Sequence, residues 1–469
     1  MKRTVLALIC ALSGAAVLTG QTRPTAQPDF GAARDEVAQL LSNLVKIDTS
    51  NPPGNETKAA NYIKQVLDKE GIPSEIFEAE PGRGNLVARL KGSGKKRPIL
   101  LMGHTDVVGI EREKWSFDPF GGTIKEGYVY GRGASDDKGM TAANLEVFLL
   151  LHRLKVDLDR DVIFLAEADE EGGGPAGIEF MVKTHWDRID SEFALNEGGS
   201  IYEKDGRVQY VGVATTEKVP RGLRVVAKGT SGHGSMPRLD NPVTHLAAAI
   251  AKIGNWQPPM RLNETTRTFF QRLAGISPPA QAQLLRALDD AKASSAAQET
   301  LRRENLMYNS MLRTSIVPTV IKGGFRNNVI PGDAEATLDV RALPDENMDA
   351  LIATLKALVD DPAIEITRTS FGGRPSPPPS RLQTDMFRAL EGAQAKVFSG
   401  TVTLPMMLTG ATDSAQLRAK GVQAYGLGSV VTDREMATIH GNDERLSVAG
   451  LGLFVQLIYA AVTEVAAAR

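Results

Sequence analysis

The sequence predicts an α/β protein, in which helices cover a mainly parallel mixed sheet and a smaller α+β unit is inserted into the chain. Short apolar runs alternate with longer segments of helical periodicity through the first half, a pattern typical of parallel sheets with crossover helices. Near residue 216 the order becomes β-α-β-β-α-β, which favours a small α+β sandwich. The proline cluster SPPPS at 376–380 then marks the return to the first unit.

The first unit is predicted from its apolar periodicity. Residues 33–47 and 140–154 repeat apolar side chains at helical spacing. The apolar runs at 98–102 (PILLM), 162–166 (VIFLA) and 193–195 have the length of buried strands. Because parallel strands need a crossover connection between them, this order favours a mainly parallel sheet.

The inserted unit is predicted to have a sheet and helices of its own. Its strands are expected at 223–228, 316–321, 334–340 and 364–369, and its helices at 242–253 and 346–359. An Ala-, Gln- and Arg-rich stretch at 263–306 is expected to add further helices, and helices at 382–395, 413–419 and 446–467 complete the first unit. We therefore place the two parts of the first unit at 28–217 and 373–469 and the inserted unit at 218–372.

Composition and charge exclude several classes of protein. The 469 residues are 42% hydrophobic and 23% charged, which are ordinary values for a soluble globular chain. Lysine and arginine total 54 against 56 acidic residues, and no basic run is present, so no nucleic-acid partner is expected. The single cysteine, Cys10, cannot form an internal disulfide or a thiolate metal cluster.

The first twenty residues are typical of a secretory signal peptide. Lys2 and Arg3 precede an apolar run at 5–18, and a polar stretch follows it. The alternative is a single N-terminal anchor. We expect residues 1–20 to be removed and the mature protein to be periplasmic or secreted. No later segment is expected to cross a membrane.

Side chains that can bind a metal follow the predicted strands. His104-Thr-Asp follows the first, the segment DEEGGG at 169–174 follows the second, and NEGG at 196–199 follows the third. Open α/β sheets bind ligands at the carboxyl ends of their strands, so these segments could converge on one site. Two further segments complete the set: GRGASDDKG at 131–139 and IHGNDE at 439–444.

The joint occurrence of these segments predicts a metal site, although each one alone is common. Imidazole and carboxylate ligands without thiolate favour zinc or a neighbouring metal. Two histidines and several carboxylates could hold two ions with one carboxylate between them. The glycine-rich loop is not a dinucleotide fingerprint, because it lacks G-x-G-x-x-G.

The ordered motifs HTDVV, YGRGASDDKG, DEEGGG, NEGG, TSGHGSMP, NNVIP and IHGNDE resemble the di-zinc carboxypeptidase/aminoacylase family. This family includes carboxypeptidase G, the carnosinases and succinyl-diaminopimelate desuccinylase. The segment YNSMLRTS and the long insertion are most similar to the carboxypeptidase S and N-acyl-amino-acid hydrolase branch. The resemblance implies a zinc-peptidase catalytic domain, a lid and dimerisation domain, and hydrolysis of an amide bond next to a free carboxylate.

The resemblance also implies the metal ligands. His104 and Glu197 would hold one Zn²⁺, and Glu171 and His440 would hold the second. Asp136 would bridge the two ions. Cobalt or manganese in place of zinc would suit the same ligands.

The resemblance assigns the proton-transfer groups next. Asp106 would orient His104. Glu170 would be the general base, which takes a proton from the attacking water and passes it to the leaving nitrogen. Spacing alone does not separate Glu170 from Glu171, and the distinction comes from the resemblance.

Substrate contacts are implied in and near the inserted unit. His233 would donate to the tetrahedral oxyanion, reaching across a homodimer, and Arg341 would bind the substrate carboxylate. Gly410 would line the substrate through its backbone. Many relatives have a substrate-contacting Asn where this chain has Thr319. Asn309 and Asn328 are the alternatives for that role.

The expected substrates are small peptides or N-acyl amino acids. Two other functions stay open at this point. One is a secreted binding protein that retains the peptidase fold without turnover, against which Glu170 argues. The other is a single-metal aminopeptidase, against which the two histidine sites and the bridging carboxylate argue. His152, His185 and His245 have no ligand-like neighbours in the sequence and are expected to be structural.

Overall fold

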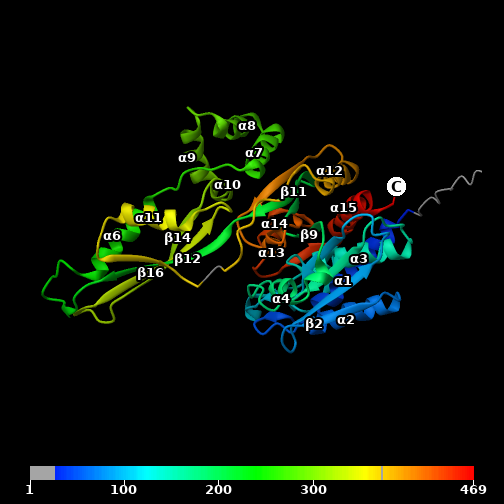
Figure 1. Ribbon diagram of the computed structural model, residues 1–469, viewed down its shortest axis with the longest axis horizontal. Coiled ribbons are helices and arrows are strands. Elements are labelled where there is room, and N and C mark those ends of the chain that lie inside the picture. Colours follow the sequence, from blue (N-terminus) through cyan, green and yellow to red (C-terminus); the bar gives the residue numbers. More distant parts are fainter. Residues whose placement is uncertain (1–26, 371–372, 469) are drawn as a thin grey trace, which may run out of the picture.

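The computed structural model describes residues 27–370 and 373–468, and the predicted signal peptide lies outside these residues. Figure 1 shows two units, a large one built on a wide sheet and a small one that extends away from it. The chain passes from the large unit to the small one between β11 (Arg207–Glu217) and β12 (Val219–Lys228). It returns through residues 373–384 to α12 (Asp385–Val397).

The large unit contains a mixed sheet, as the sequence predicts. Among the described residues this ten-stranded sheet has the order β2-β3-β8-β4-β9-β19-β11-β10-β20, with β18 paired to β11. Its central strands β8, β4, β9 and β19 run parallel, whereas β2, β3, β10 and β11 add antiparallel pairs. The bounds are β2 (Ser74–Glu78), β3 (Gly84–Leu90), β4 (Ile99–His104), β8 (Val162–Glu167), β9 (Phe193–Glu197), β10 (Ser200–Lys204), β18 (Thr403–Leu408), β19 (Gln423–Leu427) and β20 (Val430–Val431).

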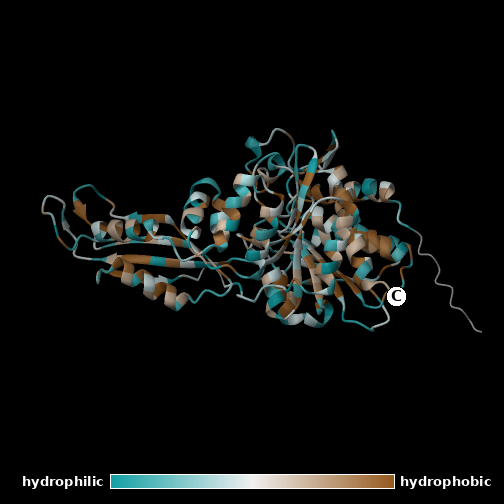
Figure 2. Ribbon diagram, turned by 90° about the horizontal axis from the view of Figure 1, so that it is seen from above, coloured by the Kyte–Doolittle hydropathy of each residue, from teal (hydrophilic) through white to brown (hydrophobic). Residues whose placement is uncertain are grey.

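Helices cover both faces of this sheet because its buried strands are apolar on both sides. Along β4, Ile99 and Leu101 pack on one helical layer, whereas Leu100 and Met102 pack on the other. The first layer holds α1 (Phe30–Val45), α2 (Thr57–Lys69), α3 (Lys138–Arg153), α12 and α15 (Val448–Ala466). The second holds α4 (Ile178–Thr184), α5 (Trp186–Ile189) and α13 (Ser414–Ala419). Figure 2 shows apolar residues concentrated in the interior of this unit.

Helix α15 corrects one expectation. By length and composition alone it could cross a membrane, whereas the sequence analysis expected no such segment. Its apolar residues lie mostly inside the protein, where they pack against α1, α3 and α12. Burial on several sides therefore accounts for its composition.

The small unit contains the predicted α+β elements. In the described chain its four-stranded sheet has the order β14-β16-β12-β17, all antiparallel. The helices α6 and α11 cover one face through an apolar core. The bounds are α6 (Pro242–Asn255), β14 (Ser315–Gly323), β16 (Asp333–Ala342), α11 (Met348–Val359) and β17 (Ile364–Arg368). The β12–β16 ladder runs from Val219↔Ala342, beside the large unit, to Lys228↔Asp333 at the far end.

The stretch between α6 and β14 forms helices that lie against the large unit (Figure 1). Phe269, Phe270 and Tyr308 from these helices pack with Leu404 and Met407 of β18. An apolar core therefore ties this insertion to the wide sheet. The helices are α7 (Glu264–Ile276), α8 (Pro279–Arg286), α9 (Ser294–Glu304) and α10 (Leu306–Met311).

Short ladders hold loops at the edge of the molecule. β21 pairs with β7, and β7 with β6, which brings the segment before α15 beside the glycine-rich loop. β1 pairs with β5, and β13 pairs with β15 in the small unit. The bounds are β1 (Ser50–Asn51), β5 (Val107–Val108), β6 (Thr123–Lys125), β7 (Tyr128–Tyr130), β13 (Gly232–His233), β15 (Val329–Ile330), α14 (Asp433–Met436) and β21 (Arg445–Ser447).

Candidate metal centre and active site

The carboxyl ends of the central parallel strands meet at one edge of the sheet. His104 is the last residue of β4 and stands opposite Glu167, the last residue of β8. Glu170 and Glu171 follow β8 within four residues, and Glu197 ends β9. The strand register therefore brings these separate sequence segments to the same edge, as the topology rule for open sheets requires.

Asp136 lies between two imidazole rings. Its Oδ1 is 3.1 Å from His104 Nε2, and its Oδ2 is 3.1 Å from His440 Nε2. The same His440 nitrogen is 2.9 Å from Glu171 Oε1. One carboxylate thus faces both histidines, each through its Nε2 atom, with a second carboxylate beside His440.

Asp106 connects His104 to the loop that carries Glu170. The His104 Nδ1 atom is 3.0 Å from the Asp106 carbonyl oxygen and 3.3 Å from its Oδ1. The backbone N–H groups of Glu170 and Glu171 donate to the two Asp106 carboxylate oxygens, each at 3.1 Å. Asn51 donates to the same carboxylate at 2.8 Å. Asp106 therefore fixes both the imidazole and the following loop, and Asn51 is a residue that the sequence analysis missed.

Glu444 holds the glycine-rich loop in place. Its buried carboxylate accepts hydrogen bonds from the backbone N–H groups of Gly133, Ser135 and Asp136 at 2.8–3.1 Å. It also accepts from Arg132 Nη1 at 2.6 Å. Since Glu444 lies four residues after His440, one segment supplies an imidazole and fixes the opposing loop. Sequence reasoning left Glu444 without a role, although it stands in the IHGNDE motif.

The chemistry of the donor set fits metal ions. Two groups of side chains have potential ligand atoms within 4.8 Å of one another: His104, Asp136 and Glu171, and His104, Glu170 and Glu197. Imidazole and carboxylate donors of this kind suit Zn²⁺ and its neighbours. Both groups share His104, so the donors form one continuous cluster.

Electrostatics of the cluster also favour a cation. Hydrogen bonds that the protonated His440 ring donates to Asp136 and Glu171 raise the pKa of His440 to about 10, so the pocket stabilises positive charge there. Burial, followed by repulsion from Glu170 and Asp136, raises the pKa of Glu197 well above its usual value. Burial alone would raise the pKa of Asp136, but His104 and His440 lower it. Concentrated buried carboxylates of this kind need bound cations to stay ionised.

Glu170 has the environment of a proton-transfer group. Burial, followed by repulsion from Asp413, raises its pKa to about 8. A carboxyl group with a pKa close to neutrality can both accept and release a proton at physiological pH. Its Oε1 atom accepts a hydrogen bond from Arg374 at 2.9 Å, a contact that the sequence analysis did not predict.

The three predicted substrate contacts do not lie together, because His233 is remote from Arg341 and Gly410. Arg341 lies at the end of β16 beside the large unit and pairs with Asp339 at 2.9 Å. Gly410 follows β18, in a loop whose Thr412 donates to Glu217. Both lie near the crossing between the two units.

His233 lies apart from the cluster of its own chain. It belongs to β13 beyond the far end of β12, and the ten paired residues of that ladder span about 30 Å. Its ring contacts Ser235, and the residue is exposed. Asn328 lies at the same end, where its carbonyl accepts from Gly234. Thr319 is exposed in the middle of β14, and Asn309 is on α10.

The remaining histidines have structural contacts. His152 hydrogen-bonds the carbonyl of Glu70, and His185 packs between Phe77 and Phe180. His245 pairs with Asp361. These contacts agree with the sequence expectation for all three.

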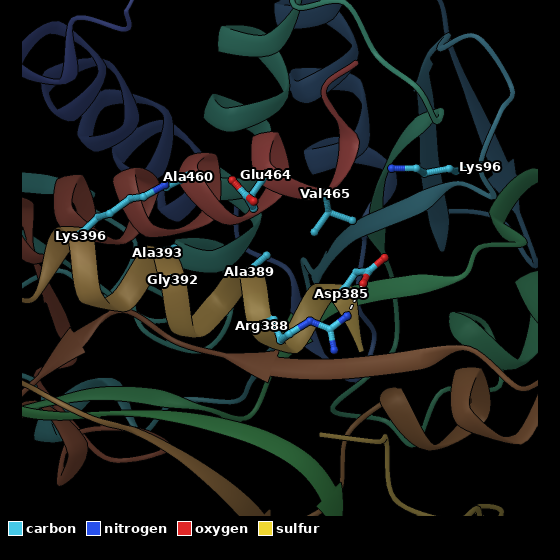
Figure 3. Close-up of a pocket in the computed structure, with 10 residues that line it drawn as sticks. All are labelled: Lys96, Asp385, Arg388, Ala389, Gly392, Ala393, Lys396, Ala460, Glu464 and Val465. Atoms are coloured by element: carbon cyan, nitrogen blue, oxygen red, sulfur yellow. Dashed lines mark hydrogen bonds and ion pairs between the residues drawn. The ribbon is translucent and has the colours of Figure 1, made fainter. Parts of the chain in front are cut away.

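A cavity of about 440 Å³ lies between α12 and α15, away from the predicted metal ligands and substrate contacts (Figure 3). Small residues of both helices form its floor, and the side chains of Lys96, Arg388 and Lys396 stand with those of Asp385 and Glu464 around it. No predicted ligand or substrate residue lines it. The candidate active site is therefore not this cavity. It is the group formed by His104, Asp136, Glu170, Glu171, Glu197 and His440, which we call the strand-end cluster.

Known proteins resemble the chain over most of its length. N-fatty-acyl-amino acid synthase/hydrolase of Xenopus tropicalis is 28% identical over 442 residues, which are 90% of this chain and 84% of the relative. Aminoacylase-1B of Rattus norvegicus is 28% identical over 435 residues, which are 90% of this chain and 94% of that relative.

Solved structures share the fold at low identity. A metallo-carboxypeptidase of Sulfolobus solfataricus matches with a TM-score of 0.68 and 19% identity, covering 91% of this chain and 98% of that one. A Bacillus subtilis protein described as a dinuclear metal binding peptidase matches with a TM-score of 0.59 and 15% identity. The match covers 92% of this chain and 98% of that one.

The model of the peptidase family M20/M25/M40 matches residues 100–464, a span that contains every residue of the strand-end cluster. The match covers far more than half of the chain, and the fold agrees with the solved members. The chain therefore belongs to peptidase family M20/M25/M40, a family of amide-bond hydrolases.

Proposed function

We propose that this chain is a two-zinc amidohydrolase that cleaves the amide bond next to a free carboxylate, in small peptides or N-acyl amino acids. The observation that carries the proposal is the position of Asp136, whose two oxygens face His104 and His440, with Glu170 at the same strand edge. A carboxylate shared by two imidazoles is the arrangement that two neighbouring ions need.

In the proposed mechanism His104 and Glu197 would hold one ion, Glu171 and His440 would hold the other, and Asp136 would be shared between the two. When bound, the two ions supply Lewis acidity and lower the pKa of water. Glu170 accepts the proton of the attacking water, whose oxygen bonds to the amide carbon. Glu170 then passes that proton to the nitrogen as the C–N bond breaks.

Substrate orientation is assigned to the residues at the crossing between the units. Arg341 pairs with the free carboxylate of the substrate, and the backbone at Gly410 lines the chain beside the scissile bond. His233 donates to the developing oxyanion from a second copy of the protein. Its distance from the cluster of its own chain supports donation from that second copy.

The protein acts outside the cytoplasm in this proposal. The charged and apolar segments in residues 1–20 support it. Relatives named as an aminoacylase and as an N-fatty-acyl-amino acid synthase/hydrolase favour N-acyl amino acids among the substrates to be tested.

The substitution Glu170→Gln tests the mechanism. It preserves the shape of the side chain and removes its ability to accept a proton, so turnover should fall about 10²–10⁴-fold. Metal content should stay at two equivalents, because Glu170 is not one of the proposed ligands. Steady-state kinetics and elemental analysis of the zinc-loaded protein measure both.

Glu171→Gln is the matched control, because it changes the adjacent carboxylate in the same way. It should lower metal content together with activity, since Glu171 contacts His440. If Glu171→Gln spared the metals and Glu170→Gln lost them, the two roles would be exchanged. A screen of dipeptides against N-acyl amino acids supplies the assay, and cleavage of neither class by metal-loaded protein would favour a binding protein.

A further inference from the structure

Arg374 contacts Glu170 from the segment that returns from the small unit. Its Nη2 atom donates to Glu170 Oε1 at 2.9 Å, and the same atom is 3.3 Å from the Glu170 carbonyl oxygen. Its Nη1 atom is 3.4 Å from Asp413 Oδ1. The guanidinium therefore lies between two acidic side chains, one of which is the proposed general base.

This cluster is buried. The side chains of Arg374, Glu170 and Asp413 are 12%, 9% and 0% exposed. Asp413 and the neighbouring Glu167 have carboxylate oxygens that form no hydrogen bond within the described part of the chain. Arg374 is thus the cation that offsets a group of buried acids on this side of Glu170.

Such a buried ion pair contributes little to stability by itself. Removing charges from water costs several kcal/mol per ion, and the attraction between them does little more than recover this cost. A well-packed apolar residue would stabilise the fold at least as well. The presence of a guanidinium here therefore points to a role in the site.

The backbone of Arg374 is itself anchored. Its carbonyl oxygen accepts a hydrogen bond from Arg221 Nη1 of β12 at 3.0 Å. The guanidinium thus extends from a backbone position fixed by the small unit towards a carboxylate of the large unit. This geometry suits a residue that holds another side chain in one orientation.

We propose that Arg374 is a positioning residue for Glu170, which holds its Oε1 atom so that the carboxylate faces the attacking water and the leaving nitrogen. The inference rests on the proposed function, because it assigns Arg374 an effect through the general base. A direct contact between Arg374 and the substrate carboxylate is the competing role.

The variants Arg374→Ala and Arg374→Lys of the full mature chain, loaded with zinc, separate these roles. Loss of positioning lowers kcat and leaves KM within about threefold, because the substrate contacts are intact. We expect about a 10²-fold loss of kcat in Arg374→Ala, since small misplacements of reacting groups have effects of that size. Arg374→Lys should recover part of it, and two equivalents of metal should remain in both.

A rise in KM of tenfold or more with unchanged kcat would overturn the inference in favour of substrate binding. Wild-type kcat in Arg374→Ala would also overturn it. If Arg374→Ala does not fold, as judged by thermal melting, Arg374→Lys decides alone. Reduced kcat at constant KM then supports the inference, and wild-type kcat contradicts it.

A double variant tests whether Arg374 acts through Glu170. When one residue works only by positioning another, removing both costs no more than removing the second alone. Glu170→Gln with Arg374→Ala should therefore be no slower than Glu170→Gln. If the fold-losses of kcat in the two single variants multiplied in the double variant, Arg374 would act independently of Glu170. Full activity of Glu170→Gln itself would instead refute the proposed mechanism, which keeps the two failures distinct.

Discussion

Asp136 has two roles at the scale of single residues because its oxygens face different histidines. Oδ1 contacts His104 and Oδ2 contacts His440. We predict that Asp136→Ala abolishes activity and lowers the content of both metals, since one carboxylate offsets the charge of both ions. Elemental analysis measures this, and two full equivalents in the variant would contradict the bridging role.

Asp137 provides the control for that experiment. Its Oδ2 atom accepts from the backbone N–H of His104 at 3.3 Å, and within the described part of the chain it makes no hydrogen bond to the ring of His104 or His440. Asp137→Asn keeps an oxygen for this hydrogen bond. It should retain two equivalents of metal, so that the comparison isolates the carboxylate that faces the histidines.

Lys218 gives a prediction about pH at the same scale. Burial, followed by repulsion from Arg341 and Arg313, lowers its pKa from 10.5 to about 7. Between these values the unfolded chain holds a proton on this lysine that the folded chain lacks, so folding stability from this group rises with pH. This contribution of Lys218 to folding stability is fully present above pH 10.5 and is lost as the pH falls towards 7.

The variant Lys218→Met should lack this trend. The stability of the wild type relative to the variant should increase between pH 7 and 10, with a slope of up to about 1.4 kcal/mol per pH unit. Urea unfolding of both proteins over this range measures the difference. Lys228→Met, at the exposed far end of the strand β12 that follows Lys218, controls for the loss of a lysine. A constant difference across the range would contradict the prediction.

The sequence allowed much of the cluster to be predicted at the residue scale. His104 and Glu197 end apolar strands, so local patterns pointed to their segments, whereas only the family resemblance separated Asp136 from Asp137 in the glycine-rich loop. Glu444 and Arg374 act through contacts with residues about 200 to 300 positions away. Such polar contacts have no local signature, because a loop glutamate or arginine looks the same whether it is buried or solvated.

At the scale of elements, the segment 440–447 fixes the glycine-rich loop. Glu444 accepts from three backbone N–H groups of that loop and from Arg132. Groups that orient metal ligands typically contribute 10–100-fold to metal affinity. We predict that Glu444→Ala weakens zinc binding by about that factor and lowers the melting temperature, because the N–H groups lose a buried acceptor.

The neighbouring Asp443 offers a matched control. Its carboxylate holds the backbone and hydroxyl of Ser116, and it contacts neither the loop nor the histidines among its described hydrogen bonds. Asp443→Asn should therefore leave zinc affinity unchanged in competition titrations with a chelator. Equal losses in both variants would show that the segment acts through general stability.

Periodicity predicted most helices and buried strands but not their order in the sheet. The apolar runs at β4, β8 and β9 are bounded and short, so local pattern was sufficient. β11 pairs with β10, β18 and β19, and its most distant paired residues, Ala214 and Gly426, are 212 positions apart in the sequence. Such register depends on long-range packing, which a single sequence does not display.

At the scale of the whole molecule, the small unit presents exposed apolar residues along β14, which pairs with β16 on one side only among the described strands. β14 is an edge strand of the four-stranded sheet. Its Val317, Val320 and Ile321 are 53%, 43% and 63% exposed. Exposed apolar edges are sites where strands of another chain pair. His233 lies at the remote end of this sheet. Pairing of two copies along β14 would therefore move the His233 of one copy towards the strand-end cluster of the other.

Subunit mixing tests this arrangement, because each of two inactive chains carries what the other lacks. His233→Ala alone should lose about 10²–10³-fold in turnover with both metals retained, as expected for an oxyanion donor. His245→Ala, which changes another histidine of the small unit that pairs with Asp361, should stay active.

Mixing Glu170→Gln chains with His233→Ala chains should restore activity, since in each heterodimer one site combines an intact Glu170 with a donated His233. Random exchange makes half of the dimers mixed, each with one complete site, so recovery should approach about one quarter of the wild-type rate. Mass spectrometry of the intact dimers confirms exchange. Exchange without recovery would mean that His233 acts within its own chain, which would require the small unit to fold back over the strand edge.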